Sequence, residues 1–317
     1  MADLVTFGET MLRYTVPAGQ RLEASDEHAV HVGGAESNVA VAAARHGVDA
    51  AWLSKLVDSP LGRKVERAVR VEGVETDVVW TDEGRQGVYY VEPADPPRDS
   101  EVVYDRAEAS VTTATAAELP TDQLASASLF YTSGITPALS STLEATTMDL
   151  LQTADEHGVT TVFDVNYRAK LWKPERCRRV LDDLLESVDV LVVGIDDAET
   201  VFERTGSPEE VARWFEERYD HEIVVVTRGE EGAVALTEGT VFEQDVFETT
   251  TRDPIGTGDA FVGGFLARWQ ATEDIASALE YGAATAALKR TIDGDMALVS
   301  PDEVRAVLDG SAAEISR

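Results

Sequence analysis

DPIGTGDAFVGGF, residues 253–265, places two glycines and an aspartate directly before a run of small and apolar residues. The run predicts a helix over 260–270, with a loop that ends at Asp259. Main-chain N–H groups are free where a helix begins, and Gly256 and Gly258 leave them accessible, so phosphate oxygens would find donors here. The charge of Asp259 would repel a bound phosphate. A base that takes a proton from an attacking hydroxyl explains this residue better, which indicates phosphoryl transfer to an alcohol.

The alternative for this stretch is structural. The glycines would then form a tight turn, and Asp259 would only cap the helix. The two common phosphate-binding patterns, GxxxxGK[ST] and a GxGxxG that opens a helix after a strand, do not occur in the sequence.

The longer context resembles a known signature. The string from Asp253 to Phe265 is similar to the C-terminal motif of the ribokinase-like sugar kinases of the phosphofructokinase-B type. The resemblance implies that Asp259 is the catalytic base and that ATP, Mg²⁺ and, as a further candidate ion, K⁺ take part. It also implies that the anion hole is formed by Gly256, Thr257 and Gly258.

A second motif, HVGGAESNVAVAAA at residues 31–44, joins a glycine pair to an alanine-rich helix. Gly34 allows a ligand to approach the backbone, and Asn38 can hydrogen-bond to hydroxyl groups. Alone, the motif also fits a helix start with a closely packed face. It resembles the first signature of the same family, GGxxxNxA, which implies that Gly34 and Asn38 face the sugar. The two signatures occur in the order that the family shows.

Short β-rich apolar runs alternate with longer segments of helical periodicity, which predicts an α/β fold with a mostly parallel sheet covered by helices. Strands are expected at residues 4–8, 50–57, 128–134, 160–165, 188–194 and 222–227. Helices are expected at residues 36–46, 61–72, 139–157, 174–187, 208–219, 260–270 and 274–290. The resemblance implies the three-layer αβα architecture of the ribokinase-like fold.

The alternation breaks at about residues 81–106, where GVYYVE, a proline-rich turn and EVVYDR predict a hairpin. With the non-helical segment 11–32, this hairpin is expected to form a small projecting sheet. The core would then comprise 1–10, 33–80 and 107–317. In the resembled family such a sheet is a lid over the sugar and often joins subunits, which implies a homo-oligomer, a dimer or higher. A decorative hairpin is the alternative.

Two further motifs follow predicted strands. GIDDAE, residues 194–199, offers carboxylates at the carboxyl end of a strand, which suits a hydrated Mg²⁺. It resembles the family's NxxE motif with Asp196 in place of the asparagine, which implies that Glu199 holds Mg²⁺ through water. Asp196 departs from the motif and is expected only as a candidate nucleotide contact; an acidic helix start is the alternative. TRGEEG, residues 227–232, resembles the TxGxxG nucleotide loop, although alone it is a glycine turn. This second resemblance implies ATP contacts from Thr227, Gly229 and Gly232.

The substrate is predicted from FDVNYRAKLW, residues 163–172. Asp164, Asn166 and Arg168 share one face if the strand stays extended. A buried Arg168 needs an anion, which the carboxylate of a sugar acid would supply; a structural pair with Asp164 is the alternative. The run resembles 2-keto-3-deoxygluconate kinases, where this arginine contacts the substrate carboxylate. Resemblance to the same group implies sugar contacts from Tyr89, Tyr104, Arg106 and Ile135.

The composition is strongly acidic. The 317 residues carry a formal net charge of −32, and only 5 of the 27 basic residues are lysine. Such a surface disfavours nucleic acid and anionic membranes as partners. It resembles that of haloarchaeal proteins, for which high salt screens the repulsion; an ordinary acidic enzyme is the alternative. The sequence has neither a signal peptide pattern nor an apolar run long enough to span a membrane, so we expect a cytoplasmic protein.

These features together predict an ATP- and Mg²⁺-dependent kinase that phosphorylates the terminal hydroxyl of 2-keto-3-deoxygluconate to give the 6-phosphate. The nearest alternative is a kinase of a neutral sugar such as fructose or ribose, with the same fold and machinery. A sugar-sensing protein that keeps the pocket without catalysis is the alternative from another class.

Overall fold

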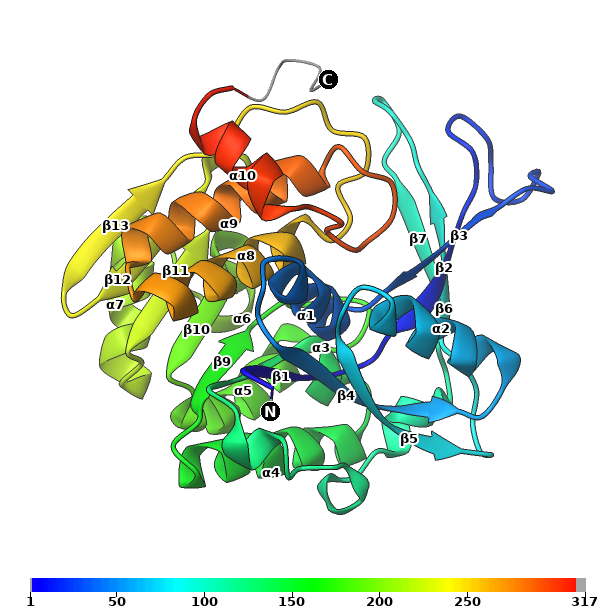
Figure 1. The fold of residues 1–317 in the computed structure, drawn as a ribbon, viewed down its shortest axis with the longest axis horizontal. Helices are drawn as coiled ribbons and strands as arrows, with labels where there is room; N and C mark the ends of the chain where they lie inside the picture. Colours follow the sequence, from blue (N-terminus) through cyan, green and yellow to red (C-terminus); the bar gives the residue numbers. More distant parts are fainter. Residues whose placement is uncertain (1, 312–317) are drawn as a thin grey trace.

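A large sheet and a small sheet organise the chain (Figure 1). The computed structural model describes residues 2–311. The large sheet has the strand order β13-β12-β11-β10-β9-β8-β1-β4-β5, and its strands are parallel except for the antiparallel pairs β11–β12 and β12–β13. Its strands are β1 (Leu4–Phe7), β4 (Ala50–Val57), β5 (Glu75–Thr81), β8 (Leu129–Ser133), β9 (Thr160–Asp164), β10 (Val190–Gly194), β11 (Ile223–Thr227), β12 (Ala233–Thr237) and β13 (Thr240–Gln244).

Alternate residues of each strand build two separate hydrophobic cores, one on each face of the large sheet. In β1, Val5 and Phe7 belong to one core and Leu4 to the other, as the two-residue period of a strand requires. The central strands are rich in valine because both of their faces are covered.

Helices cover both faces of the large sheet, so the molecule has three layers (Figure 1). Several begin where a serine side chain accepts a main-chain N–H and a proline follows, as at Ser59 and Ser207. On one face lie α1 (Ala35–Arg45), α2 (Pro60–Arg70), α8 (Thr257–Thr272) and α9 (Ile275–Lys289), with α10 (Pro301–Leu308) packed on α9. On the other face lie α3 (Ile135–Ala138), α4 (Ser141–Glu156), α5 (Pro174–Leu184), α6 (Ile195–Phe202) and α7 (Pro208–Tyr219).

The small sheet projects from one side of the large one (Figure 1) and has the order β3-β2-β6-β7. Only residues 8–10 separate β1 from β2, and only Gly34 separates β3 from α1. Met11 and Tyr89 on the small sheet pack against Ile255, which precedes α8. The strands are β2 (Met11–Thr15), β3 (Ala29–Gly33), β6 (Val88–Glu92) and β7 (Glu101–Asp105).

The predicted α/β architecture and all six predicted strands of the large sheet are confirmed. The helix predicted at 260–270 instead begins at Thr257, and the helix predicted at 139–157 is preceded by the separate short helix α3. β5, β12, β13, α6 and α10 were not predicted from the sequence. Within residues 2–311, no helix combines the length and apolar character that crossing a bilayer requires.

Candidate functional site

A cleft of about 660 Å³ lies between the large sheet and the small sheet. Its floor includes Asp164, Gly194 and Thr227, at the carboxyl ends of the neighbouring parallel strands β9, β10 and β11. This edge is the usual ligand site of an open α/β sheet. The start of α8 and residues of β6 and β7 complete the lining, so the cleft collects nearly all the motifs of the sequence analysis.

The start of α8 forms a cradle of free donors. Gly256 caps the helix with φ of 84°, and a Cβ there would lie 2.0 Å from the carbonyl oxygen of Asp295, so only glycine fits. Within the described part of the chain, the amides of Gly258 and Asp259 have no acceptor. Thr257 differs from the expectation, because its amide and its hydroxyl both donate to the carbonyl of Pro254, at 3.3 and 2.7 Å.

Asp259 therefore lies in the first turn of α8 and not in a loop before it. The helix starts early because tertiary packing overrides the low helix propensity of the glycines. At Gly263, a Cβ would lie 2.4 Å from the Cβ of Ala42 on α1, so α1 and α8 pack very closely. This close packing brings residues of the two signatures together.

Asn38 on α1 donates from Nδ2 to Oδ2 of Asp259 at 2.7 Å. Desolvation by burial raises the pKa of Asp259 to about 6, while the hydrogen bond from Asn38 and the charge of Arg168 oppose the rise. A carboxylate with this pKa is largely ionised at neutral pH and is still a useful proton acceptor. Asn38 lines the cleft, as expected, but its amide is held by the carboxylate.

Gly34 also lines the cleft, but packing explains its identity. A Cβ at Gly34 would lie 2.0 Å from the main-chain oxygen of Glu9, between β1 and β2. The glycine thus lets two segments of the chain cross, and the resulting contact sets where α1 begins.

The segment after β9 corrects one expectation. β9 ends at Asp164, and Asn166 has φ of 39°, so the strand does not stay extended as far as Arg168. The turn still places all three side chains on the cleft. Arg168 is exposed and not buried; Nη1 donates to the carbonyl oxygen of Tyr167 at 3.0 Å. Within residues 2–311 no salt bridge joins Arg168 to Asp164, which leaves the guanidinium available to an anionic ligand.

The acidic residues of the cleft differ from those predicted. Asp196 and Glu199 are exposed on α6 and lie outside the lining, whereas Asp197 belongs to it. Asp197 accepts the amide of Tyr167 at 3.1 Å. The spacing from Gly194 to Asp197 is nearly one helical turn, and both residues line the cleft.

Asp164 and Asp197 give the cleft two carboxyl groups near the ends of β9 and β10. Desolvation raises the pKa of Asp164 to about 8, and the charges of Asp197 and Asp259 add to the rise. Within the described residues, no group of three or more His, Cys, Asp or Glu side chains could hold a metal ion. Two carboxylates still suit Mg²⁺, which usually keeps waters and phosphate oxygens as its other ligands.

The small sheet contributes aromatic and basic side chains to the cleft. Tyr89 is buried, and its hydroxyl donates to Asp295. Arg106 forms an ion pair with the buried Glu9, and its guanidinium lies 5.4 Å from the centre of the Tyr104 ring. Its buried Nε has no acceptor within residues 2–311. The half-buried Ile135, at the start of α3, also lines the cleft.

Of the predicted nucleotide loop, only Thr227 lines the cleft. Gly232 has φ of 89°, and a Cβ there would lie 2.0 Å from the carbonyl of Gln244, so this glycine serves the β12–β13 hairpin. Gly229 has φ of 58° and begins a short 3₁₀ turn with open space around it.

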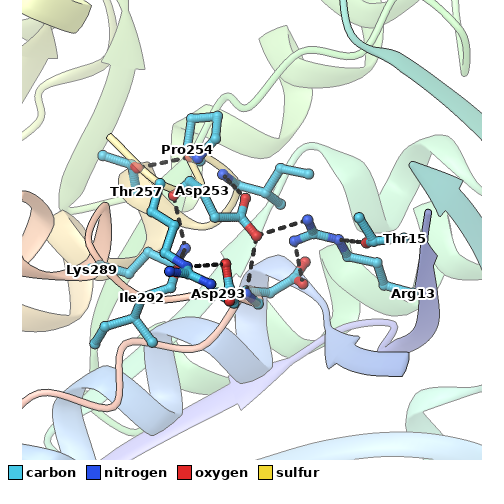
Figure 2. Close-up of polar contacts among 12 residues, drawn as sticks. Arg13, Thr15, Asp253, Pro254, Thr257, Lys289, Ile292 and Asp293 are labelled. Atoms are coloured by element: carbon cyan, nitrogen blue, oxygen red, sulfur yellow. Dashed lines mark hydrogen bonds and ion pairs between the residues drawn. The ribbon is translucent and has the colours of Figure 1, made fainter. Parts of the chain in front are cut away.

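A buried charged cluster beside the cleft was not predicted (Figure 2). Arg13 on β2 pairs with Asp253 at 2.7 Å and with Asp295 at 3.1 Å. Lys289, at the end of α9, donates to the main-chain oxygens of Asp253 and Ile292. No local sequence pattern links these residues, which come from three separate segments of the chain.

The chain is similar to known proteins over nearly its full length. The model of the pfkB family carbohydrate kinases matches residues 1–302. The chain is 56% identical over 316 residues to a 2-dehydro-3-deoxygalactonokinase of Haloferax volcanii, covering 100% of this chain and 99% of that protein. The crystal structure of a 2-dehydro-3-deoxygluconokinase from Thermotoga maritima has a TM-score of 0.92 and 32% identity, covering 97% and 98% of the two chains.

A putative ribokinase II from E. coli, in complex with ATP and Mg²⁺, has the same fold, with a TM-score of 0.89 at 20% identity over 98% of this chain and 100% of that chain. The family match spans nearly the whole sequence, and it includes both signatures whose residues meet at Asn38 and Asp259. The chain therefore belongs to the pfkB family of carbohydrate kinases.

Proposed function

We propose that this kinase transfers the γ-phosphoryl group of ATP to the terminal hydroxyl of a 2-keto-3-deoxy sugar acid. One observation carries the proposal: the exposed guanidinium of Arg168 shares a cleft with Asp259 and the free amides at the start of α8. A carboxylate-binding group and a phosphoryl-transfer site in one cleft suit a substrate with an acid at one end and a hydroxyl at the other.

We propose 2-keto-3-deoxygalactonate as the preferred acid, with 2-keto-3-deoxygluconate, its C4 epimer, as the second candidate. The sequence motifs predicted the gluconate. The relative at 56% identity is named for the galactonate, and the solved structure at 32% identity is named for the gluconate. The higher identity over the full length favours the galactonate.

In the proposed mechanism, the carboxylate of Asp259 accepts the proton of the attacking hydroxyl, and Asn38 holds it in place. The amides of Gly258 and Asp259 stabilise the charge that develops on the transferring phosphoryl group. Arg168 binds the acid group. Asp164 and Asp197 are the side chains that would hold Mg²⁺, which supplies neutralisation of the phosphate charge when it is bound with ATP.

We also propose that the small sheet covers the sugar and joins two copies of the chain. The supporting observations are that Val103 on its edge strand β7 is 41% exposed, and that the neighbouring Tyr104, on the opposite face of the strand, lines the cleft. The sedimentation of a Val103→Glu variant tests this contact, since a wild-type mass would contradict it.

An ADP-release assay over a panel of sugars in high KCl tests the function. We expect turnover of the two keto-acids, the galactonate with the higher kcat/KM, and little turnover of fructose or ribose. Arg168→Ala should raise the KM for the acids about tenfold or more without changing the melting temperature. Arg179→Ala, on α5 outside the cleft, is the matched control.

Two results would favour the alternative functions. A neutral sugar kinase would turn over fructose or ribose well and would be indifferent to Arg168→Ala. A sugar-sensing protein would bind a keto-acid in calorimetry and release no ADP in any salt.

A further inference from the structure

Lys289 is a fully buried lysine at the end of α9, with 0% of its surface exposed. It is one of only five lysines in a chain whose basic residues are otherwise arginine. Its Nζ donates to the main-chain oxygen of Asp253 at 3.1 Å and to that of Ile292 at 3.3 Å. A buried ammonium held by carbonyl oxygens calls for an explanation, because removing a charge from water is costly.

Charged side chains of both signs surround Lys289. Asp253 and Asp295 are both buried, and Arg13 bridges them, so the cluster has two acidic and two basic side chains. Burial lowers the pKa of Lys289, and the carboxylates of Asp253 and Asp295 oppose the change. Figure 2 shows Lys289 and Arg13 approaching Asp253 from opposite sides.

The cluster is joined directly to the start of α8. Oδ1 of Asp253 accepts the amide of Ile255 at 3.1 Å, and Oδ2 accepts the amide of Gly294 at 3.0 Å. The carbonyl of Asp295 packs so tightly against Gly256 that no side chain fits there. Lys289 thus holds one end of the loop whose other end presents the free amides of the cradle.

We propose that Lys289 is a positioning residue that acts as a built-in monovalent cation. Its ammonium occupies a site lined by main-chain oxygens, where a K⁺ ion could otherwise bind, and it fixes the loop 253–256 so that the amides at the start of α8 stay aimed at the phosphoryl group. An ammonium is a compact point charge with three donors, which arginine cannot imitate in such a small space. The enzyme therefore needs no K⁺ for turnover.

This inference rests on the proposed role of the start of α8 in phosphoryl transfer.

The test compares kcat in KCl, NaCl and tetramethylammonium chloride, each at the same high concentration. Wild-type kcat should agree within about twofold among the salts. Lys289→Met should lower kcat about tenfold or more and leave the KM for ATP within about threefold, because positioning and not binding is lost. Lys64→Met, on the exposed face of α2, is the matched control.

Lys289→Ala adds a second readout, since it opens space for a free ion. Ammonium chloride should raise both its melting temperature and its kcat relative to tetramethylammonium chloride, with no such difference in the wild type. If Lys289→Met does not fold, the wild-type salt series and the melting temperatures of Lys289→Ala still test whether Lys289 replaces a monovalent cation. A wild-type enzyme that requires K⁺, a Lys289→Met variant with normal kcat, or a Lys289→Ala variant indifferent to ammonium overturns the inference. An active Asp259→Asn variant would instead refute the proposed site itself.

Discussion

Replacing Asn38 by alanine should shift the pH dependence of turnover. Asn38 Nδ2 donates to Oδ2 of Asp259 at 2.7 Å, and this hydrogen bond favours the ionised carboxylate. Without it, desolvation acts with less opposition, and the pKa of Asp259 rises above its present value of about 6. Because the base must be deprotonated to accept a proton, the variant should lose activity at the acidic end of the profile.

The expected size follows from the strength of one charge-assisted hydrogen bond. Such a bond contributes about 1.5–3 kcal/mol, and one pKa unit corresponds to about 1.4 kcal/mol, so the pKa of Asp259 should rise by about 1–2 units. The acidic limb of kcat/KM, which reports groups of the free enzyme, should move from about pH 6 to about pH 7–8. Above that range the two proteins should converge to within a few-fold.

The assay is ADP release at limiting sugar acid over pH 5–9, at constant ionic strength. Ionisation of ATP affects both proteins equally, so the difference between their limbs isolates the enzyme. Ser37→Ala is the control, because Ser37 lies on the same helix and bonds to Thr10 and Gly34 but not to Asp259. An Asn38→Ala limb within about 0.3 units of the wild type would refute the reasoning, since that shift corresponds to less than about 0.5 kcal/mol.

Three further predictions concern the same site. Asp259→Asn should lower kcat by about 10²–10⁴, and normal turnover would contradict this. The raised pKa of Asp259 in the folded state lowers the stability of the wild type as pH rises from about 4 to 6, so at pH 8 the variant should have a free energy of unfolding in urea about 1–3 kcal/mol higher than that of the wild type. Gly256→Ala should lower the melting temperature, since holding an alanine at φ of 84° alone costs about 1–2 kcal/mol. Gly258→Ala should fold normally but lose activity, because its methyl group enters the open cradle. Equal melting temperatures for the two variants would contradict this. Arg106→Ala should destabilise the protein by about 3–5 kcal/mol, measured by chemical unfolding, because Glu9 is left buried and unpaired; adding Glu9→Gln should restore much of this loss, and no recovery would exclude that cause.

Local patterns in the sequence predicted several residues that line the cleft. The glycine signature and the GGxxxNxA motif are each short and contiguous, so their resemblance to the family's motifs can be recognised without the fold. Valine-rich strands such as β10 and β11 were equally clear because both of their faces are buried.

Edge elements and long-range contacts could not be predicted in this way. β5 and β13 are half-exposed edge strands whose apolar runs are only three and two residues long, too short to predict a strand by themselves. The choice of Asp197 over Glu199 depends on the rotation of α6, which a linear motif does not define. The pair of Arg13 with Asp295 joins residues 282 positions apart, and only the fold brings them together.

The crossing of Gly34 over the main chain of Glu9 has a mechanical consequence. Residues 8–10 lead from β1 into β2 and Gly34 leads from β3 into α1, so both chain connections of these two strands to the core meet at this contact. Asn38 lies one helical turn beyond Gly34 and donates a hydrogen bond to Asp259, the proposed proton acceptor. We therefore expect that a substitution in β2 or β3 that displaces Gly34 would also displace Asn38, and would alter turnover without contacting the sugar.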